Sequence, residues 1–499
     1  VDLKGMFVLP GFIDSHMHFV HTAKSMKCVN LFGTKSIKEI RELISEKAAQ
    51  LNSDKSDNQS NIWIEGEGWN HDYFTDEKRF PNKTDLDDIT GDIPALIVRA
   101  CNHIGVLNTS ALKLIGLDKN SAASYENLVE VLPDGEPNGV IKESMLERVM
   151  SLLSNFTKDE LKELIDEAQY KLLAQGITSI HTDDIGFIPN YNYDLVFNAY
   201  RELDKENKLH LRISEQCLFR EKQKIEKFFK TYSYGWGNDK FRISCVKLIS
   251  DGSLGARTAA LRNAYSDDSS TCGLPLFTQN KLNDFVLCSH RNNCPVAIHA
   301  IGDEAVEMAL NAIEYAQNTD PSHNLRHGIV HCQITDKDMI QRFAKLGILA
   351  YVQPIFINYD MNIVYDRVGK NLAETSYAWK SMIDKNIHVS FGTDSPVETF
   401  NTMPNIYSAV TRKNITGENK KTYLPCEKMT MYEAIRSYTV EGAYASGQED
   451  IKGSISPGKL ADFILLDRDL FNLKNDEEIL NTRVLKVYSD GEKIYELKK

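Results

Sequence analysis

The chain has 499 residues and lacks three features that would each place it in a particular class of protein. No apolar run reaches the roughly 18 residues of a membrane-spanning helix, so such a helix is excluded. The nine cysteines are odd in number and scattered, with no C-x-x-C pair, which indicates a reduced compartment and thiols that act as small buried apolar groups. Basic residues are not in excess. The net charge of −12 argues against nucleic acid or an anionic membrane surface as a partner.

What remains is the composition of an ordinary soluble protein, with 42% hydrophobic and 26% charged residues. We expect a cytoplasmic protein that acts on a small molecule, and we leave a homo-oligomer open. No signal-peptide pattern is present, but the chain begins at Val1 rather than at methionine. We therefore expect the native start to lie further upstream, which leaves a removed leader open.

Eight β-rich segments alternate with helical patterns along the chain. They are Phe12–His18, Ile177–His181, Leu209–Glu215, Arg242–Ile249, Pro295–His299, Gly328–His331, Ile348–Gln353 and Ile387–Phe391. Alternating strands and helices predict a parallel sheet, and eight units favour an α/β fold with a closed, distorted (β/α)₈ TIM barrel. An open, doubly wound sheet is the alternative, and the number of strands alone does not exclude it.

The helices between these segments carry end signals. Thr157-Lys158-Asp159-Glu160 is a capping box, followed by apolar residues at helical spacing and then by the helix-ending Gly176. The stretch Thr335–Leu346, ended by Gly347, repeats this design. Glu304–Gln317 is an amphipathic helix after the fifth strand.

Two parts of the chain depart from the alternation. Residues from about 30 to 155 form an insertion after the first strand, which on a barrel would lie over the active face. The residues after 446 indicate a small all-β appendage, because Asp490-Gly491 between two β runs is a strong hairpin signal. We predict a barrel over residues 6–446, and a remnant of a small β-sandwich in residues 1–5 and 447–499. The insertion contains a polar loop, two strand-like runs and an aromatic cluster: Asn52–Ser60, Ile62–Glu65, Ala95–Arg99 and Trp69–Phe74.

Candidate metal ligands stand at the ends of the predicted strands. His16 and His18 are two residues apart on one strand, so their imidazoles share a face. His299 and His331 end two later strands, and Asp394 follows the last one. Each late histidine alone is better explained as a buried structural residue. Because the carboxyl ends of all barrel strands open on one face, however, the whole set predicts a transition-metal site, with zinc as the first choice.

A lysine interrupts the fourth strand. Lys247 lies in the apolar run Cys245–Ile249, and an isolated buried ammonium is very costly. A salt bridge to Asp251, or a side chain that reaches water, would explain it structurally. The functional explanation is a carbamate formed with carbon dioxide, which would be an anionic oxygen ligand able to bridge two metal ions. The sequence leaves these explanations open.

Several motifs, taken in order, resemble the amidohydrolase superfamily and its amidohydrolase-3 (YtcJ-like) branch. The resemblance covers essentially the whole chain, and the order of its pieces makes it specific. The pieces are Phe12–His18 preceded by Pro10-Gly11, Val246–Gly255 with Arg257-Thr258-Ala259, His299–Asp303, Gly392–Pro396 and Pro457–Phe463. Members of this branch normally have several β-strands before the first motif, so the small β-domain is expected to be incomplete in this chain.

The resemblance implies roles for the candidate residues. The metal-site residues would be His16, His18, Lys247, His299, His331 and Asp394. Lys247 would be carboxylated, and Asp394 would be the general base that becomes the general acid. Four weaker candidates for substrate contacts, each with an equally good structural explanation, are His103, His181, Arg257 and Trp69.

These observations predict a metal-dependent hydrolase of a C–N bond other than a peptide bond, with one or two divalent ions, zinc first among them. Metal-activated hydroxide does not specify the bond, so hydrolysis of another ester-type bond is an alternative. A non-enzymatic regulatory or binding protein on the same scaffold is another. The proton-carrying aspartate disfavours this second alternative, because binding alone does not require it.

Overall fold

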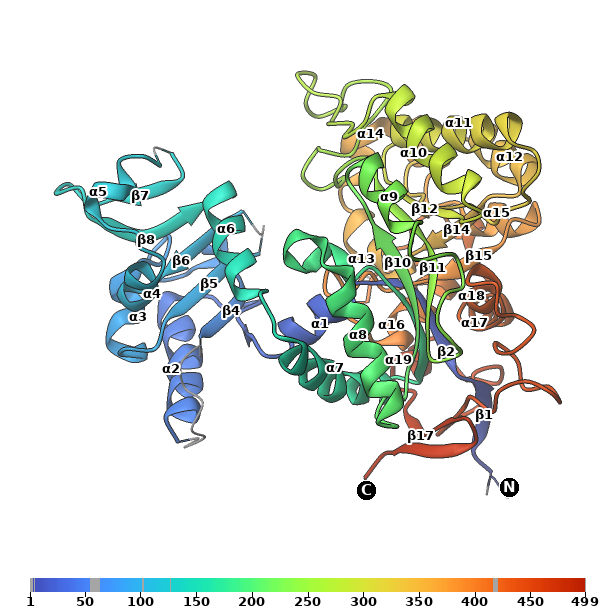
Figure 1. Cartoon of the computed structure of the whole chain (residues 1–499), viewed down its shortest axis with the longest axis horizontal. Coiled ribbons are helices and arrows are strands. Elements are labelled where there is room, and N and C mark those ends of the chain that lie inside the picture. The colour runs from blue at the N-terminus through green and yellow to red at the C-terminus, as the bar shows by residue number, and fades with distance from the viewer. Residues whose placement is uncertain are drawn as a thin grey trace. The chain divides into compact units, whose positions relative to one another are not determined.

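The computed structural model describes residues 3, 5–53, 63–100, 103–125, 127–415 and 421–498. The chain divides into two compact units. The first joins Val1–His21 to Thr157–Lys499, and the second is Thr22–Phe156. Figure 1 shows the elements of both.

The first unit is built on an eight-stranded parallel sheet. Its strand order follows the order of the chain from β2 to β15, without a switch point, so the barrel is confirmed and the doubly wound alternative is wrong. Seven strands keep their predicted place within two residues at each end, and β10 lies three residues further along than expected at both ends. The strands are β2 (Phe12–Met17), β9 (Ile177–Thr182), β10 (Arg212–Leu218), β11 (Phe241–Ile249), β12 (Val296–Ala300), β13 (Gly328–His331), β14 (Leu349–Val352) and β15 (Val389–Phe391).

The barrel closes where the chain after β15 meets the end of β2. The backbone N–H of Asp394 donates to the carbonyl oxygen of His16 at 2.8 Å. The N–H of His18 donates to the carbonyl oxygen of Ser395 at 2.9 Å. The first and last strands are therefore joined at their carboxyl ends, where the candidate ligands lie.

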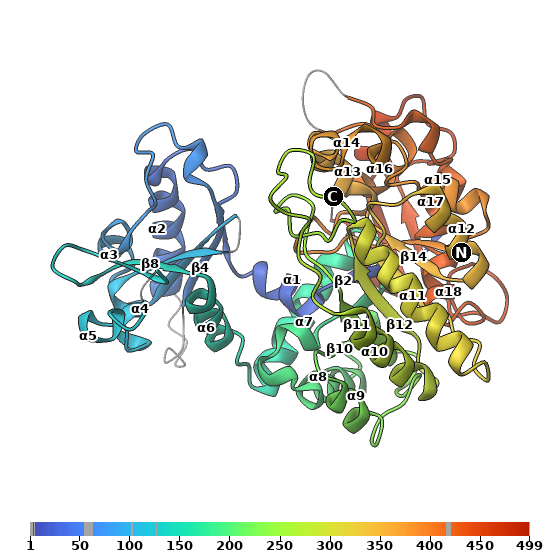
Figure 2. The ribbon, with the colours of Figure 1, turned by 90° about the horizontal axis from the view of Figure 1, so that it is seen from above.

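The helices of this unit surround the strands, as the view from above in Figure 2 shows for α8, α10, α11 and α12. The capping box of Thr157 and Glu160 forms as predicted and opens α7. Asp336, rather than Thr335, caps α12, and Gly347 ends that helix with a φ of 65°. The helices are α7 (Lys158–Leu173), α8 (Tyr193–Lys205), α9 (Lys222–Phe228), α10 (Gln279–Arg291), α11 (Asp303–Thr319), α12 (Lys337–Leu346), α13 (Ile357–Asp360), α14 (Val364–Ala373), α15 (Trp379–Asp384), α16 (Thr402–Thr411), α17 (Met431–Ser437), α18 (Val440–Ala445) and α19 (Glu477–Leu480).

A second, antiparallel sheet in this unit has the order β1-β16-β17-β18. The predicted Asp490-Gly491 turn joins its last two strands, and both residues have a positive φ, of 54° and 81°. The predicted barrel range of 6–446 includes β1, but β1 pairs with β16 and so belongs to the small sheet. The strands are β1 (Phe7–Pro10), β16 (Phe463–Leu466), β17 (Val484–Ser489) and β18 (Glu492–Glu496).

The second unit is a six-stranded sheet with the order β3-β4-β5-β6-β8-β7. Apolar side chains form a core on each face of this sheet. The unit spans Thr22–Phe156, so the insertion begins earlier than the predicted residue 30. Asn52 and Ser53 end a helix rather than lie in a loop, and residues 54–62 lie outside the described residues.

The elements of the second unit are short apart from one long helix. The strands are β3 (Val29–Asn30), β4 (Ile64–Trp69), β5 (Ala95–Arg99), β6 (Ile104–Leu107), β7 (Val129–Val131) and β8 (Pro137–Lys142). The helices are α2 (Ile37–Ser53), α3 (Lys83–Thr90), α4 (Thr109–Leu114), α5 (Lys119–Ala122) and α6 (Glu143–Leu153), and α1 (Phe19–Ser25) crosses the boundary between the units.

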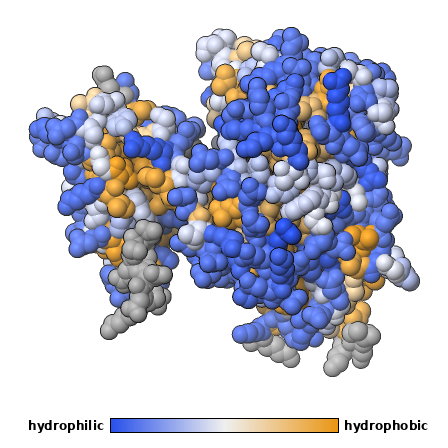
Figure 3. All heavy atoms as spheres, viewed as in Figure 1, coloured by the Kyte–Doolittle hydropathy of each residue, from blue (hydrophilic) through white to orange (hydrophobic). Residues whose placement is uncertain are grey.

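Hydrophilic residues cover most of the surface visible in Figure 3, and apolar residues appear there in small separate areas. Among the helices within the described ranges, none is long and apolar enough to cross a membrane.

Candidate metal centre

The candidate ligands of the first unit gather at the carboxyl ends of the barrel strands. His16 is the next-to-last residue of β2, and His331 is the last residue of β13. Asp394 lies three residues beyond the end of β15. His331 and Asp394 have left-handed backbones, with φ of 77° and 58°. For a residue other than glycine this costs about 1 kcal/mol or more, and such strain is concentrated at functional sites.

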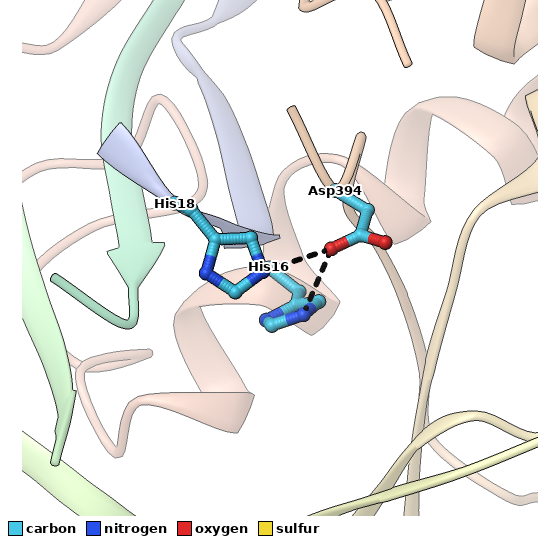
Figure 4. A group of neighbouring side chains, drawn as sticks. All are labelled: His16, His18 and Asp394. Carbon is cyan, nitrogen blue, oxygen red and sulfur yellow. Dashed lines mark ion pairs between the residues drawn. The ribbon is translucent and has the colours of Figure 1, made fainter. Parts of the chain in front are cut away.

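Asp394 joins the two histidines of the first motif. Its Oδ1 lies 3.2 Å from Nε2 of His16 and 3.2 Å from Nε2 of His18. Figure 4 shows both rings turned toward this oxygen. Among the described residues, these three form the group whose ligand atoms all lie within 4.8 Å of one another. The shared face inferred from the His-x-His spacing therefore exists, and Asp394 reaches it from the loop after the last barrel strand, β15.

In each histidine ring, the contact made by one nitrogen indicates which nitrogen is free to bind a metal ion. Nδ1 of His16 lies 3.0 Å from Oε1 of Gln216, and Nδ1 of His331 lies 2.8 Å from Oε1 of Gln353. Because an amide oxygen only accepts, both rings carry a proton on Nδ1. Their Nε2 atoms are left with lone pairs.

The other two histidines use backbone and carboxylate partners. Nδ1 of His18 lies 3.4 Å from the carbonyl oxygen of Asp183, which again leaves Nε2 for the site. His299 is reversed, since its Nε2 lies 3.4 Å from Oδ1 of Asp251 and 3.3 Å from the carbonyl oxygen of Gly252. Its Nδ1 is therefore the nitrogen available as a ligand. The His299 and His331 rings meet edge to face at 4.4 Å between centroids.

Lys247 reaches the same group. Its side chain is buried, and Nζ lies 3.2 Å from Nε2 of His16. The suggested salt bridge to Asp251 is wrong, because that carboxylate turns away to hold loops at the barrel mouth. It accepts backbone N–H groups and lies beside His299; the N–H donors are Ala260, Ile301 and Gly302, at 2.9 to 3.1 Å.

Burial and charge set the protonation of the group. Burial and the nearby Lys247 lower the pKa of His16 to about 3. Burial also lowers the pKa of His331 well below its ordinary value. Burial alone would raise the pKa of Asp394, but its contacts with His16 and His18 outweigh burial and hold that pKa well below its usual range. The result is neutral imidazoles at His16 and His331 beside an ionised carboxylate, which is the form that binds metal ions. Burial disfavours a charged His18, but its contact with Asp394 outweighs burial and raises the pKa of His18.

Three of the four weaker candidates have clear structural surroundings, whereas the buried Nε2 of His181 has no hydrogen-bond partner among the described residues. His181 is buried inside the barrel, with its ring 6.4 Å from that of Tyr351. Arg257 forms a two-bond ion pair with Asp267, at 3.1 and 2.9 Å. Its structural explanation is therefore the one that the geometry supports.

The other two weaker candidates lie in the second unit. His103 is largely exposed and pairs with Glu143 at 3.0 Å. Trp69 is fully buried in the apolar core of that unit. Both keep the structural explanations that the sequence offered.

Sequence reasoning missed the residues that hold the ligands. The sequence does not mark Gln216 and Gln353 as site residues, and Asp14 appears in it only as part of the motif Phe12–His18. A polar residue within or directly after an apolar strand is the pattern that could have identified them. The same pattern identified the histidines.

Comparison with known proteins agrees with this geometry. The model of the amidohydrolase family, in its amidohydrolase-3 branch, matches residues 1–495. The chain belongs to the amidohydrolase family. The resemblance drawn from the motifs is thereby confirmed. A curated relative, the putative amidohydrolase YtcJ of Bacillus subtilis, is 30% identical over 501 residues, which cover 99% of this chain and 90% of YtcJ.

Two further matches extend over most of the chain. The N-substituted formamide deformylase of Arthrobacter pascens is 24% identical over 517 residues, covering 99% of this chain and 90% of that protein. The crystal structure of an uncharacterized metal-dependent hydrolase from Pyrococcus furiosus is 28% identical, with a TM-score of 0.76, and covers 95% of this chain and 89% of that one. The barrel and its small sheet thus belong to an architecture already seen in a metal-dependent hydrolase.

Proposed function

We propose that this protein is a metal-dependent hydrolase that cleaves a C–N bond, other than a peptide bond, in a small amide or formamide-like molecule. The observation that carries the proposal is the buried carboxylate of Asp394, within 3.2 Å of Nε2 of both His16 and His18. An ionised carboxylate beside two imidazole nitrogens fits both metal binding and proton transfer. Membership of the amidohydrolase family supports hydrolysis as the reaction.

The donor set fits a divalent metal ion. Imidazole nitrogens and carboxylate oxygens are the ligands that zinc prefers among the common ions. His16, His18, His331 and Asp394 would hold the ion or ions, and His299 would add its Nδ1. Each of these histidines would have its other ring nitrogen in contact with a second group, as metal-binding histidines usually do.

The chain supplies the proton transfer. When bound, a divalent ion would supply an acidified water at neutral pH and would polarise the substrate carbonyl. Asp394 accepts a proton from the attacking water and later delivers it to the leaving nitrogen, which departs as a neutral amine. Its strained backbone and its contacts with His16 and His18 hold the carboxylate in place for both transfers.

Lys247 is proposed to carry a carbamate. Burial lowers the pKa of its amine, which favours the neutral, nucleophilic form. Addition of the amine to carbon dioxide forms an N–C bond and releases one proton, leaving a carboxylate on the lysine. This anion would compensate the positive charge of metal ions in a site where, among the described residues, the amine has His16 as its hydrogen-bond partner.

The name of one similar protein supports the bond class, and that of another supports metal-dependent hydrolysis. One is an N-substituted formamide deformylase, and another is described as a metal-dependent hydrolase. We extend the class of bond to this chain and no particular substrate. A regulatory or binding protein on the same scaffold is the second candidate, but binding alone gives no reason for a strained aspartate at the mouth of the barrel.

The test combines metal analysis with a substrate panel. We expect about one to two zinc ions per chain after reconstitution, and hydrolysis of at least one amide or formamide. No bound metal at full reconstitution would refute the proposal. Metal without hydrolysis of any amide, formamide or ester would favour the binding protein.

The carbamate has its own variants. Lys247→Ala should lose metal and turnover, and propionate should restore part of both by placing a carboxylate in the vacated space. Lys345→Ala is the matched control, because the side chain of Lys345 is 75% exposed on α12. Full metal content and turnover in Lys247→Ala would exclude the carbamate.

A further inference from the structure

We propose that Gln216 and Gln353 are positioning residues, which fix the ligand nitrogen of His16 and His331 while adding no charge to the site. This inference rests on the proposed metal-dependent function. The two glutamines come from different strands, since Gln216 lies on β10 and Gln353 directly follows β14. They nevertheless make the same contact, from Oε1 to Nδ1 of a buried histidine, at 3.0 and 2.8 Å.

The orientation of each amide is determined by its second contact. Nε2 of Gln216 donates to the carbonyl oxygen of Ser15 at 3.3 Å, and Nε2 of Gln353 donates to that of Tyr351 at 3.5 Å. A flipped amide would set its oxygen against a carbonyl oxygen and its NH₂ group against the ring. Each glutamine therefore presents an acceptor to Nδ1, and each ring keeps its proton there.

Water has no access to replace these contacts. Gln216 and Gln353 are 1% and 2% exposed, and the rings of His16 and His331 are buried with them. Without the amide oxygen, Nδ1–H would be an unpaired buried donor, and the proton would have no reason to stay on that nitrogen. The glutamines thus decide which nitrogen is free for a metal ion.

The neutrality of the amide is the second part of the inference. The usual partner of a metal-binding histidine is a carboxylate or a carbonyl. The one carboxylate partner here, Asp251, accepts three backbone N–H groups besides contacting His299. Oδ1 of Asp394 already lies 3.2 Å from Nε2 of both His16 and His18, so a further negative charge beside these rings would make a metal-bound water less acidic.

The experiment separates orientation from charge. Gln216→Leu and Gln353→Leu remove the acceptor, whereas Gln216→Glu and Gln353→Glu keep the shape and add a charge. Gln341→Leu and Gln341→Glu are the controls, since Gln341 is exposed on α12. The measurements are the zinc dissociation constant by chelator competition, the visible spectrum of the cobalt-substituted protein, and the pH profile of kcat/KM.

We expect the leucine variants to bind zinc about 10- to 100-fold more weakly and to change the cobalt spectrum. The glutamate variants should shift the acid limb of the pH profile to higher pH, because an added negative charge raises the pKa of bound water. The Gln341 variants should change none of these. Should a leucine variant fail to fold, the shift of the acid limb in the nearly isosteric glutamate variant is the measurement that tests the inference.

Wild-type zinc affinity and cobalt spectrum in the leucine variants would overturn the positioning role. An unshifted acid limb in the glutamate variants would overturn the role of neutrality. Either result, with a wild type that binds zinc and hydrolyses an amide, leaves the proposed function intact. A wild type that binds no metal defeats the proposed function itself.

Discussion

Thr393 donates twice to the carboxylate of Asp14, through its backbone N–H at 3.1 Å and its hydroxyl at 2.6 Å. The same carboxylate accepts the backbone N–H of His16 at 3.1 Å. Thr393 immediately precedes Asp394, so one buried side chain on β2 fixes the backbone next to two site residues. The closure of the barrel and the geometry of the site depend on the same few hydrogen bonds.

Thr393→Val should therefore weaken the fold and the site together. Valine has the shape of threonine but no hydroxyl, and it leaves Asp14 with one hydrogen bond fewer in a buried place. We expect a loss of about 1–3 kcal/mol in the free energy of unfolding. Weaker zinc binding should accompany it. Urea unfolding and chelator competition measure the two effects.

Thr393→Ser is the matched control, because serine keeps the hydroxyl and loses only a methyl group. It should retain zinc affinity and most of the stability. If Thr393→Val binds zinc like the wild type, Asp14 stabilises the barrel without positioning the site.

Asp394→Asn tests the proton carrier. The amide keeps the size and one oxygen of the carboxylate but cannot accept a proton at neutral pH. We expect kcat to fall by about 10²- to 10⁴-fold while metal remains bound. Metal analysis and steady-state kinetics on the best substrate of the panel measure both quantities.

Asp338→Asn makes the same chemical change at an exposed position on α12 and should leave kcat unchanged. A normal turnover in Asp394→Asn would assign the proton transfers to another group.

The sequence predicted the barrel and its ligands because both depend on short-range patterns. Strand periodicity placed His16 and His18 on one face, and the strand ends placed Asp394 beside them. Gln216 and Gln353 escaped prediction because a lone glutamine has no characteristic spacing, and its role appears only when the neighbouring strand is in register. The partner of Arg257 escaped for a similar reason, since Asp267 lies on the same long loop and is brought back by turns that no periodicity marks.

The small sheet is fastened to the barrel by a buried arginine. Arg212, on the first residue of β10, donates two hydrogen bonds to Asp462, at 2.6 and 2.9 Å, and also contacts Asp490. Its side chain is 2% exposed. Asp462→Ala should cost about 3 kcal/mol of stability, because it leaves the buried guanidinium with one charged partner, Asp490, besides the carbonyl oxygen of Asp239.

Removing both charges should lower the stability of the protein less than removing one of them. The double variant Arg212→Met with Asp462→Ala has no unpaired buried charge, so it should recover part of the stability lost in Asp462→Ala. Thermal unfolding of the single and double variants measures the coupling. Equal stability of Asp462→Ala and the wild type would mean that Asp490 alone suffices to hold Arg212.

Two buried histidines, His290 and His327, lie away from the candidate metal site, near the amino end of β13, and predict a pH-dependent stability. The backbone N–H of Val296 donates to Nδ1 of His327 at 3.1 Å, so the proton of His327 is on Nε2, which lies 2.9 Å from Nδ1 of His290. Nε2 of His290 in turn donates to the carbonyl oxygen of Asp320 at 2.8 Å. Both rings are neutral in this chain of hydrogen bonds, and a proton added to Nδ1 of His327 would face the N–H of Val296.

Burial, together with the nearby His290, lowers the pKa of His327 from 6.5 to about 3. Between these two values the unfolded chain binds a proton that the folded chain does not. The stabilisation is therefore complete above the unfolded pKa and falls by about 1.4 kcal/mol for each pH unit as the pH drops through this window.

His327→Asn, which accepts and donates without titrating, should make the plot of unfolding free energy against pH shallower by one proton. His103→Asn, on a ring that is 62% exposed, should leave the slope unchanged. An unchanged slope in His327→Asn would mean that His327 is already protonated in the folded chain, against the hydrogen bond from Val296.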